Sequence, residues 1–174
     1  MLAPAAIRVL AAALAAGWAL PALGEEPDVF GVTLRGITYS AARSGSSELV
    51  LHADQAELLP GRGEVALRGV RVQLGRVVAV GEALAGLELS CAEGTLSLDT
   101  RGFVASGEVH GRTPDGREFQ TERVAYDPER GRVWSDAPVL VREPAGTLLA
   151  QGFEYRVREG SFRMTGGASV VPSG

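Results

Sequence analysis

The side chains best suited to chemistry are few in this 174-residue chain and are not grouped into any known catalytic pattern. Its two histidines, His52 and His110, lie far apart, and each alternates with apolar neighbours. Nucleophilic catalysis needs a nucleophile and an orienting carboxylate beside a histidine, and no G-x-S-x-G, H-E-x-x-H or C-x-x-C pattern occurs. Nothing selects a catalytic pair among the 21 acidic residues. We therefore predict surface histidines and no enzymatic activity.

The single cysteine, Cys91, offers little redox or metal chemistry. One thiol cannot form an internal disulfide, and a metal site needs several ligands. The sequence accordingly predicts no metal and no cofactor. Because Cys91 lies in an apolar stretch, we expect a small buried side chain.

Charged residues around one predicted hairpin could meet anionic groups. Five arginines gather there, namely Arg112, Arg117, Arg123, Arg130 and Arg132. Glutamates are interspersed among them, so a solvated face of mixed charge is the simpler interpretation. The formal net charge of −4 argues against a nucleic-acid partner, which would require a basic footprint. Asp115-Gly116 and Asp127-Pro128 are expected to form turns.

The first 24 residues have the composition of an export segment. A run of apolar residues from Val9 to Leu23 follows Arg8, and small residues precede a cleavage position after Gly24. The alternative is an uncleaved membrane anchor, although fifteen helical residues span only about 22 Å of a hydrocarbon core of about 30 Å. Both interpretations predict that the rest of the chain is exported. We divide the chain into residues 1–24, a signal peptide or membrane anchor, and residues 25–174, one domain.

From Glu25 onward the sequence alternates between apolar and polar residues in short runs, which is typical of strands. Clear examples are residues 29–39, 48–58, 64–74 and 87–98. Breaks rich in glycine and proline separate such runs, as at residues 60–63, 113–116 and 127–131. No stretch has sustained helical periodicity.

Aligning the runs reveals a degenerate repeat of strand, turn and strand. A small residue marks the reference position of each of its copies: Ala53, Cys91, Thr121 and Ala150. Large apolar residues recur two positions before it and five and twelve after it: Leu51, Leu58, Val65, Leu89, Leu96, Phe103, Phe119, Tyr126, Val133, Leu148, Tyr155 and Phe162. Sixteen after it stands glycine at Gly69, Gly107 and Gly166, and Ala137 in the third copy. A small side chain permits close approach of a neighbouring strand, and glycine permits a bulge or bend.

Repeated strand pairs bury a continuous interior only against a second sheet or by closing on themselves. The sequence therefore predicts an all-β protein, an antiparallel β-jelly roll or short β-solenoid, preceded by one N-terminal apolar helix.

Residues across this body resemble the LptC family. Residues 34–58 and 68–74 fit its opening and middle strands, and residues 146–170 fit its closing strands. The stretch RTPDGREFQTERVAYDPERGRVWSDAPVLV is similar to a family pattern through the spacing of Thr121, Tyr126-Asp127, Ser135-Asp136 and Pro138-Val139. One departure is the N-terminal segment, because LptC proteins usually keep a membrane anchor and this segment looks cleavable.

The resemblance implies a periplasmic jelly roll, associated with the inner membrane, that transports lipopolysaccharide without catalysis. Acyl chains would lie against the twelve recurring apolar residues. The implied partners are lipopolysaccharide, the inner-membrane export ABC transporter at the N-terminal edge, and an LptA-like periplasmic protein at the C-terminal edge, which residues 161–171 would form.

Two other functions stay open from the sequence. An LptA-like soluble bridge, or another structural module of the envelope, would share the same repeat. An enzyme acting on polysaccharide on a β-solenoid would instead require a cluster of carboxylates on one outer face.

Overall fold

The computed structural model describes residues 32–43, 46–59, 61–76, 85–143 and 146–171, and within them the chain is entirely strand and turn. The ten strands form one sheet. Their bounds are β1 Thr33–Arg43, β2 Ser46–Leu59, β3 Glu64–Arg76, β4 Ala85–Ser97, β5 Phe103–Arg112, β6 Glu118–Asp127, β7 Arg132–Ser135, β8 Val139–Glu143, β9 Gly146–Arg156 and β10 Ser161–Val171. The predicted all-β fold is confirmed, whereas the predicted N-terminal helix in residues 1–24 lies outside the described residues.

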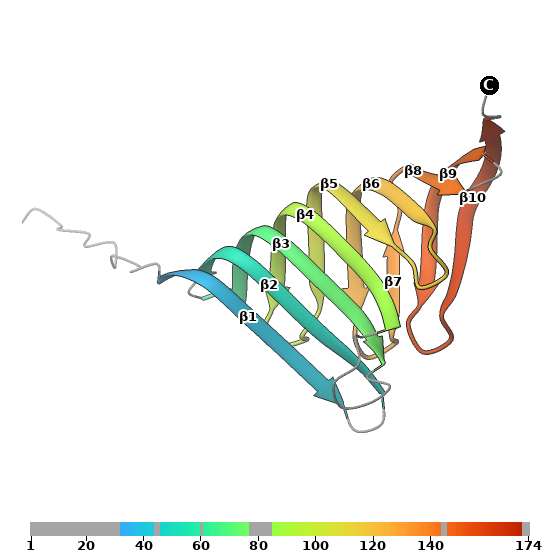
Figure 1. The fold of residues 1–174 in the computed structure, drawn as a ribbon. Helices are drawn as coiled ribbons and strands as arrows, with labels where there is room; N and C mark the ends of the chain where they lie inside the picture. The colour runs from blue at the N-terminus through green and yellow to red at the C-terminus, as the bar shows by residue number, and fades with distance from the viewer. Residues whose placement is uncertain (1–31, 44–45, 60, 77–84, 144–145, 172–174) are drawn as a thin grey trace, which may run out of the picture.

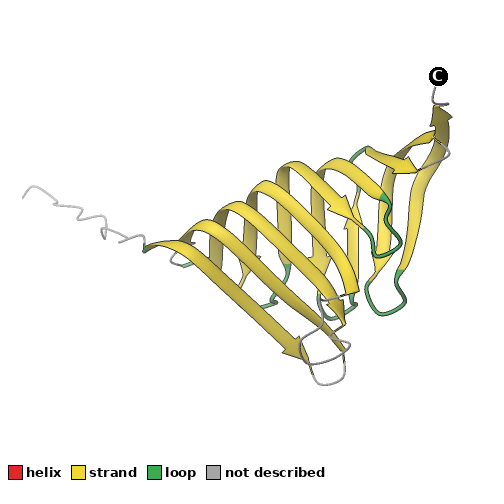
Figure 2. Cartoon of the chain, viewed as in Figure 1, coloured by secondary structure: helices red, strands yellow, loops and turns green. Residues whose placement is uncertain are grey.

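All pairings are antiparallel, and from β1 to β6 and from β9 to β10 each strand pairs with the next in the chain, while β7 and β8 each pair with β6 and β9, so the sheet is a meander from β1 to β10 (Figure 1). Among the described residues, short turns that contain a glycine join β4 to β5, β5 to β6, β6 to β7 and β9 to β10 (Figure 2). At one of them the Asp127 carboxylate accepts hydrogen bonds from the backbone N–H groups of Glu129 and Arg130, which confirms that Asp127 forms a turn.

Most strands bend near their midpoint, and the bend folds the single sheet into two layers (Figure 1). In β5 the residues Gly107 and Glu108 face one residue of β6, which is a β-bulge, and Gly107 has a φ of 71°. The predicted glycine of β3, Gly69, also has a positive φ, of 60°. A side chain there would collide with the Asp54 carboxylate, at 2.1 Å, so glycine is required both for the backbone angle and for space.

The seventh pass through the sheet is broken rather than bent. Ala137 stands where other copies carry glycine, and residues 136–138 separate β7 from β8. Both strands pair with β6 and β9, so together they occupy the place of one bent strand. Pro138 adds to the break because it has no N–H for a sheet hydrogen bond.

We call the half of the sheet that contains β8 layer 1 and the half that contains β7 layer 2. Layer 1 holds the first halves of β2, β4, β6 and β9 and the second halves of β1, β3, β5 and β10. Layer 2 holds the remaining halves. Inward-facing residues of both layers form one hydrophobic core, and outward-facing residues alternate with them along each strand.

Candidate functional site

One apolar row crosses layer 2 from β2, next to the edge strand β1, to the edge strand β10. Strand pairing sets eight of the twelve predicted residues directly opposite one another, in the order Leu58, Val65, Leu96, Phe103, Tyr126, Val133, Tyr155 and Phe162. These are the positions five and twelve residues after the reference position. The repeat in the sequence is therefore a single line of contacts in space.

A second row crosses the inner face of layer 1. It contains the other four predicted residues, joined by residues of the intervening strands, in the order Tyr39, Leu51, Val72, Leu89, Gly111, Phe119, Val141, Leu148 and Val170. The small reference residues Ala53, Cys91, Thr121 and Ala150 are all buried beside the bends. Their size fits the inner corner between the layers.

Three phenylalanines join the two layers near β10. The ring of Phe119 in layer 1 lies 4.7 Å from that of Phe153 and 5.6 Å from that of Phe162, both in layer 2, measured between centroids. Phe153 and Phe162 are stacked at 5.0 Å. The Phe119 ring also covers Gly111, where an added Cβ would lie 2.0 Å from it.

Side chains are buried at the centre of each row and partly exposed to solvent at its ends. Phe103, Val133 and Tyr155 are at most 1% exposed. Leu58 at the β1 end is 39% exposed, and Val170 on β10 is 64% exposed. Val65, Leu148 and Phe162 are intermediate. The centre is therefore a packed core, and apolar surface reaches solvent at both edges of the sheet.

The turn between β5 and β6 spans Thr113–Arg117 and carries an acidic side chain, Asp115. Thr113 is buried, and its hydroxyl donates a hydrogen bond to the Asp115 carboxylate. That bond, with the nearby Arg117 guanidinium, lowers the pKa of Asp115 below its ordinary 3.8. Burial raises the pKa of Tyr155, and the negative charge of Asp115 raises it further. The two side chains are thus close enough to interact across the gap between the layers.

Cys91 is buried and its thiol donates a hydrogen bond to the Glu93 carbonyl at 3.0 Å. Burial raises the pKa of the thiol to about 11. At neutral pH it stays protonated and unreactive, as expected for a packing residue.

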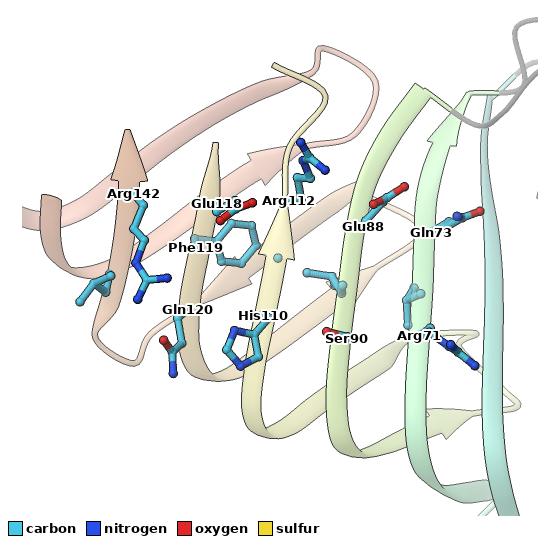
Figure 3. Close-up of a pocket in the computed structure, with 14 residues that line it drawn as sticks. Arg71, Gln73, Glu88, Ser90, His110, Arg112, Glu118, Phe119, Gln120 and Arg142 are labelled. Carbon is cyan, nitrogen blue, oxygen red and sulfur yellow. The ribbon is translucent and has the colours of Figure 1, made fainter. Parts of the chain in front are cut away.

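The outer face of layer 1 carries a shallow groove of about 410 Å³, lined by β3, β4, β5, β6 and β8 (Figure 3). Figure 3 shows Arg71, Ser90, His110 and Gln120 in one line across these strands, which strand pairing confirms. Its walls mix arginines with Glu88 and Glu118. Both histidines are exposed on this layer: His52 shares a hydrogen bond with the Thr38 hydroxyl, and His110 lies 3.4 Å from Glu108.

The arginines of the predicted cluster are interspersed with acids. Arg117 pairs with Asp115 and Glu143, Arg130 with Asp127, and Arg132 with Glu154. The Arg132 guanidinium also lies 4.4 Å over the Trp134 ring.

Within the described ranges, no group of three or more His, Cys, Asp or Glu residues is arranged to hold a metal ion. The same residues include no helix long and apolar enough to cross a membrane.

Sequence reasoning missed two features of the interior. Phe153 occupies a repeat position that other copies fill with Ala56, Gly94 and Val124, so no recurrence marked it. The buried hydroxyls of Thr121 and Ser135 lie 3.2 Å apart at the break between β7 and β8. Thr121 donates to the Pro138 carbonyl, and Ser135 accepts from the Ala137 N–H. The spacing of Thr121 and Ser135 in the sequence matches the family pattern, but it does not indicate this hydrogen-bonded contact at the break.

Comparison with known proteins identifies the family. A model of LptC-related proteins of lipopolysaccharide assembly matches residues 19–170. The chain belongs to the LptC family. A search of curated proteins finds no match. Among solved structures, this LptC-family chain is similar to LptH of Pseudomonas aeruginosa, described as the LptA-homologous periplasmic component of the lipopolysaccharide transport device. The two share 16% identity with a TM-score of 0.50, covering 72% of this chain and 95% of LptH, which establishes a shared fold.

Proposed function

We propose that this protein transports lipopolysaccharide through the periplasm without catalysis, holding acyl chains between its two layers. The observation that carries the proposal is the unbroken apolar row from Leu58 to Phe162, whose ends reach solvent at the two edges of the sheet. Each methylene buried there contributes about 0.8 kcal/mol, so a few acyl chains provide substantial binding energy. The twelve recurring residues are the proposed contacts.

The edges of the sheet suit docking to similar sheets. In the described residues β1 pairs only with β2, and β10 only with β9, so each presents an unpaired edge that can add a strand from a partner. We place the inner-membrane ABC transporter at the β1 edge and an LptA-like protein at the β10 edge. In that arrangement the apolar rows continue from one protein to the next. The protein would lie in the periplasm at the inner membrane, held by an N-terminal anchor or exported with a cleaved signal.

Photo-crosslinking in intact cells tests this function. Benzoyl-phenylalanine replaces Phe119 or Phe162 in the interior, and replaces Arg123, an exposed residue of β6, as the control. We expect lipopolysaccharide adducts at the two interior positions and none at Arg123. A folded, exported protein that gives no interior adduct would exclude lipid transport through the interior and favour a structural role in the envelope.

The likeness to LptH supports a second candidate, a soluble bridge between other components. The two candidates differ in what the β1 edge contacts. Crosslinking from Leu34 on β1 to a transporter subunit supports the first, and crosslinking only to other periplasmic rolls supports the second.

A further inference from the structure

Four turns of layer 2 lie side by side along one rim of the roll. Because the strands bend near their midpoint, the bends join the layers along one side, and the turns at the strand ends lie along the other. The layer 2 turns are residues 61–63, 98–102, 128–131 and 157–160. Hydrogen bonds from the Leu98 N–H to the Gly63 carbonyl and from the Val157 N–H to the Gly131 carbonyl join neighbouring turns. Each turn serves two strands, so successive turns are about 10 Å apart.

Each of these turns carries an exposed arginine. The four are Arg62, Arg101, Arg130 and Arg158. Each follows the small reference residue of its copy by eight to ten positions, so arginine at the turn is part of the repeat. Arg101 has a left-handed φ of 58°, an angle that strains a residue with a Cβ. Backbone strain of this kind occurs most often at functional sites.

Most of the four guanidinium groups are free to bind a ligand. Within the described ranges, Arg62, Arg101 and Arg158 form no ion pair. The side chain of Arg130 is 74% exposed, and its Nε lies 3.7 Å from the Asp127 carboxylate. A planar guanidinium presents paired N–H donors that match the oxygens of a phosphate. The rim therefore presents phosphate-binding groups at intervals of about 10 Å.

Acidic residues occur in or beside the same turns, but most are engaged elsewhere. Asp127 accepts two backbone hydrogen bonds within its own turn. The Glu159 carboxylate lies 3.7 Å from the Arg156 guanidinium, outside the turn. The Asp99 carboxylate packs against the neighbouring turn. Glu129 is the one further acid of these turns, so free cationic groups outnumber free anionic ones along the rim.

The described turn of layer 1 differs in this respect. Its arginine, Arg117, lies 3.0 Å from the Glu143 carboxylate and 3.4 Å from the Asp115 carboxylate. Two acids thus neutralise this guanidinium. The charge available to an anionic ligand is therefore concentrated on the layer 2 rim.

Apolar side chains reach solvent beside these arginines. Leu98 is 47% exposed and stands three residues before Arg101, and Leu58 is 39% exposed and stands four residues before Arg62. Leu98 follows the inward-facing Leu96 by two residues and continues its face of the strand. A molecule with an apolar chain and an anionic head can contact leucine with one part and arginine with the other.

We propose that the arginines of the layer 2 turns form a rim that binds the phosphate-bearing head group of the lipid whose chains lie in the interior. This inference rests on the proposed function, because it names what holds the head group along the same path. Exposed charge pairs are individually weak, so the head group can move from one arginine to the next without being trapped.

Calorimetric titration of the purified full-length chain tests the rim. Its probes are decyl phosphate, uncharged decanol of the same chain length, and inorganic phosphate. A rim variant carries the four substitutions Arg62→Gln, Arg101→Gln, Arg130→Gln and Arg158→Gln. A control variant loses the same charge from exposed arginines of the strands, through Arg35→Gln, Arg68→Gln, Arg123→Gln and Arg163→Gln. Circular dichroism verifies that both variants are folded.

We expect the rim variant to bind decyl phosphate about three- to fivefold more weakly than the parent, and decanol equally well. The control variant should match the parent with both probes. Unchanged binding of decyl phosphate in the rim variant, or an equal loss in the control variant, overturns the rim and leaves the proposed function standing. Inorganic phosphate that binds as tightly as decyl phosphate, with the same loss in the rim variant, shows a site for free phosphate and also overturns the proposal. A parent protein that binds neither decyl probe overturns the proposed function and the rim with it.

A second measurement locates the bound phosphate. A spin label on Glu129→Cys lies next to Arg130, and a label on Glu122→Cys lies near the bend of β6, while buried Cys91 stays unlabelled. We expect the label at position 129 to broaden the phosphorus resonance of bound decyl phosphate and the label at position 122 to leave it sharp. Broadening by the label at position 122 alone, or equally by both, would place the phosphate away from the rim and overturn the proposal.

Discussion

The middle and the β1 end of the layer 2 row both carry large apolar residues of the same repeat, yet the residue in the middle is core and the residue at the end is surface. Val133 is fully buried between Tyr126 and Tyr155, whereas Leu58 is 39% exposed between Val65 and the edge strand. The difference arises from what lies on each side, since Val133 has large buried residues on both sides, whereas Leu58 on β2 has only the beginning of the edge strand β1 on one side. An apolar side chain at the end is therefore available to a partner or ligand.

The largest effect that this comparison predicts is on stability. Phe103→Ala removes a fully buried ring from the middle of the row and is expected to lower the free energy of unfolding by about 3–5 kcal/mol. Leu58→Ala at the end should cost less than about 1 kcal/mol, because its side chain is already partly in water. Urea unfolding followed by circular dichroism measures both. Equal losses would show that the β1 end is as well packed as the middle.

The next effect separates crowding in a middle strand, β5, from backbone strain in the edge strand β1. Gly111→Ala in the middle drives a methyl into the Phe119 ring and should cost about 1–3 kcal/mol. Gly36→Ala on β1 meets no atom within 4 Å but has a φ of 59°, so left-handed strain should cost about 1–2 kcal/mol.

The two glycine variants are distinguished by their response to Phe119→Leu. The smaller side chain should relieve the crowding in Gly111→Ala, giving a favourable coupling free energy, and leave the cost of Gly36→Ala unchanged. If the changes in the free energy of unfolding are additive in both double variants, the cost of Gly111→Ala does not arise from crowding against Phe119.

The smallest effect is on thiol reactivity. In a Leu58→Cys variant, the introduced thiol at the end should react with maleimide at pH 8 at least about tenfold faster than Cys91, whose pKa is about 11. Peptide mass mapping quantifies both sites in one sample. Comparable rates in the folded protein would mean that the middle opens as often as the end.

Much of the fold could be predicted because large apolar residues recur at the inward-facing positions of each copy of the repeat. The large apolar residues fixed the two rows, and the predicted bends at Gly69 and Gly107 carry positive φ angles. The alternation of apolar and polar residues does not reveal that the bent strands cross both layers, because inward-facing residues alternate in the same way on both sides of a bend. The break between β7 and β8 also escaped prediction, because a single Ala137 in place of glycine is a weak signal.

The candidate site was predictable only in part. Leu58 was predicted to be interior because the alternation of residue types shows which face of a strand a side chain lies on but not how deeply it is buried. Its exposure depends on the absence of a further strand beyond β1 among the described residues. Phe153 was not predicted because the other three copies of the repeat carry smaller residues at the equivalent position, so no large apolar residue recurs there. The Arg117–Glu143 pair joins residues of two hairpins, and nothing in a sequence of many charges singles out such a pair.

The meander has a consequence for how the roll forms and how it can change in length. Because each strand pairs with strands next to it or one removed from it in the chain, each hairpin can assemble on the one before it, and such local pairing favours rapid folding. Because strand pairing is local, adding or removing one strand pair moves the far edge of the sheet and leaves the pairing of the other strands unchanged. The distance that such a roll spans is thus set by copy number, while the two edge strands stay free to keep their partners.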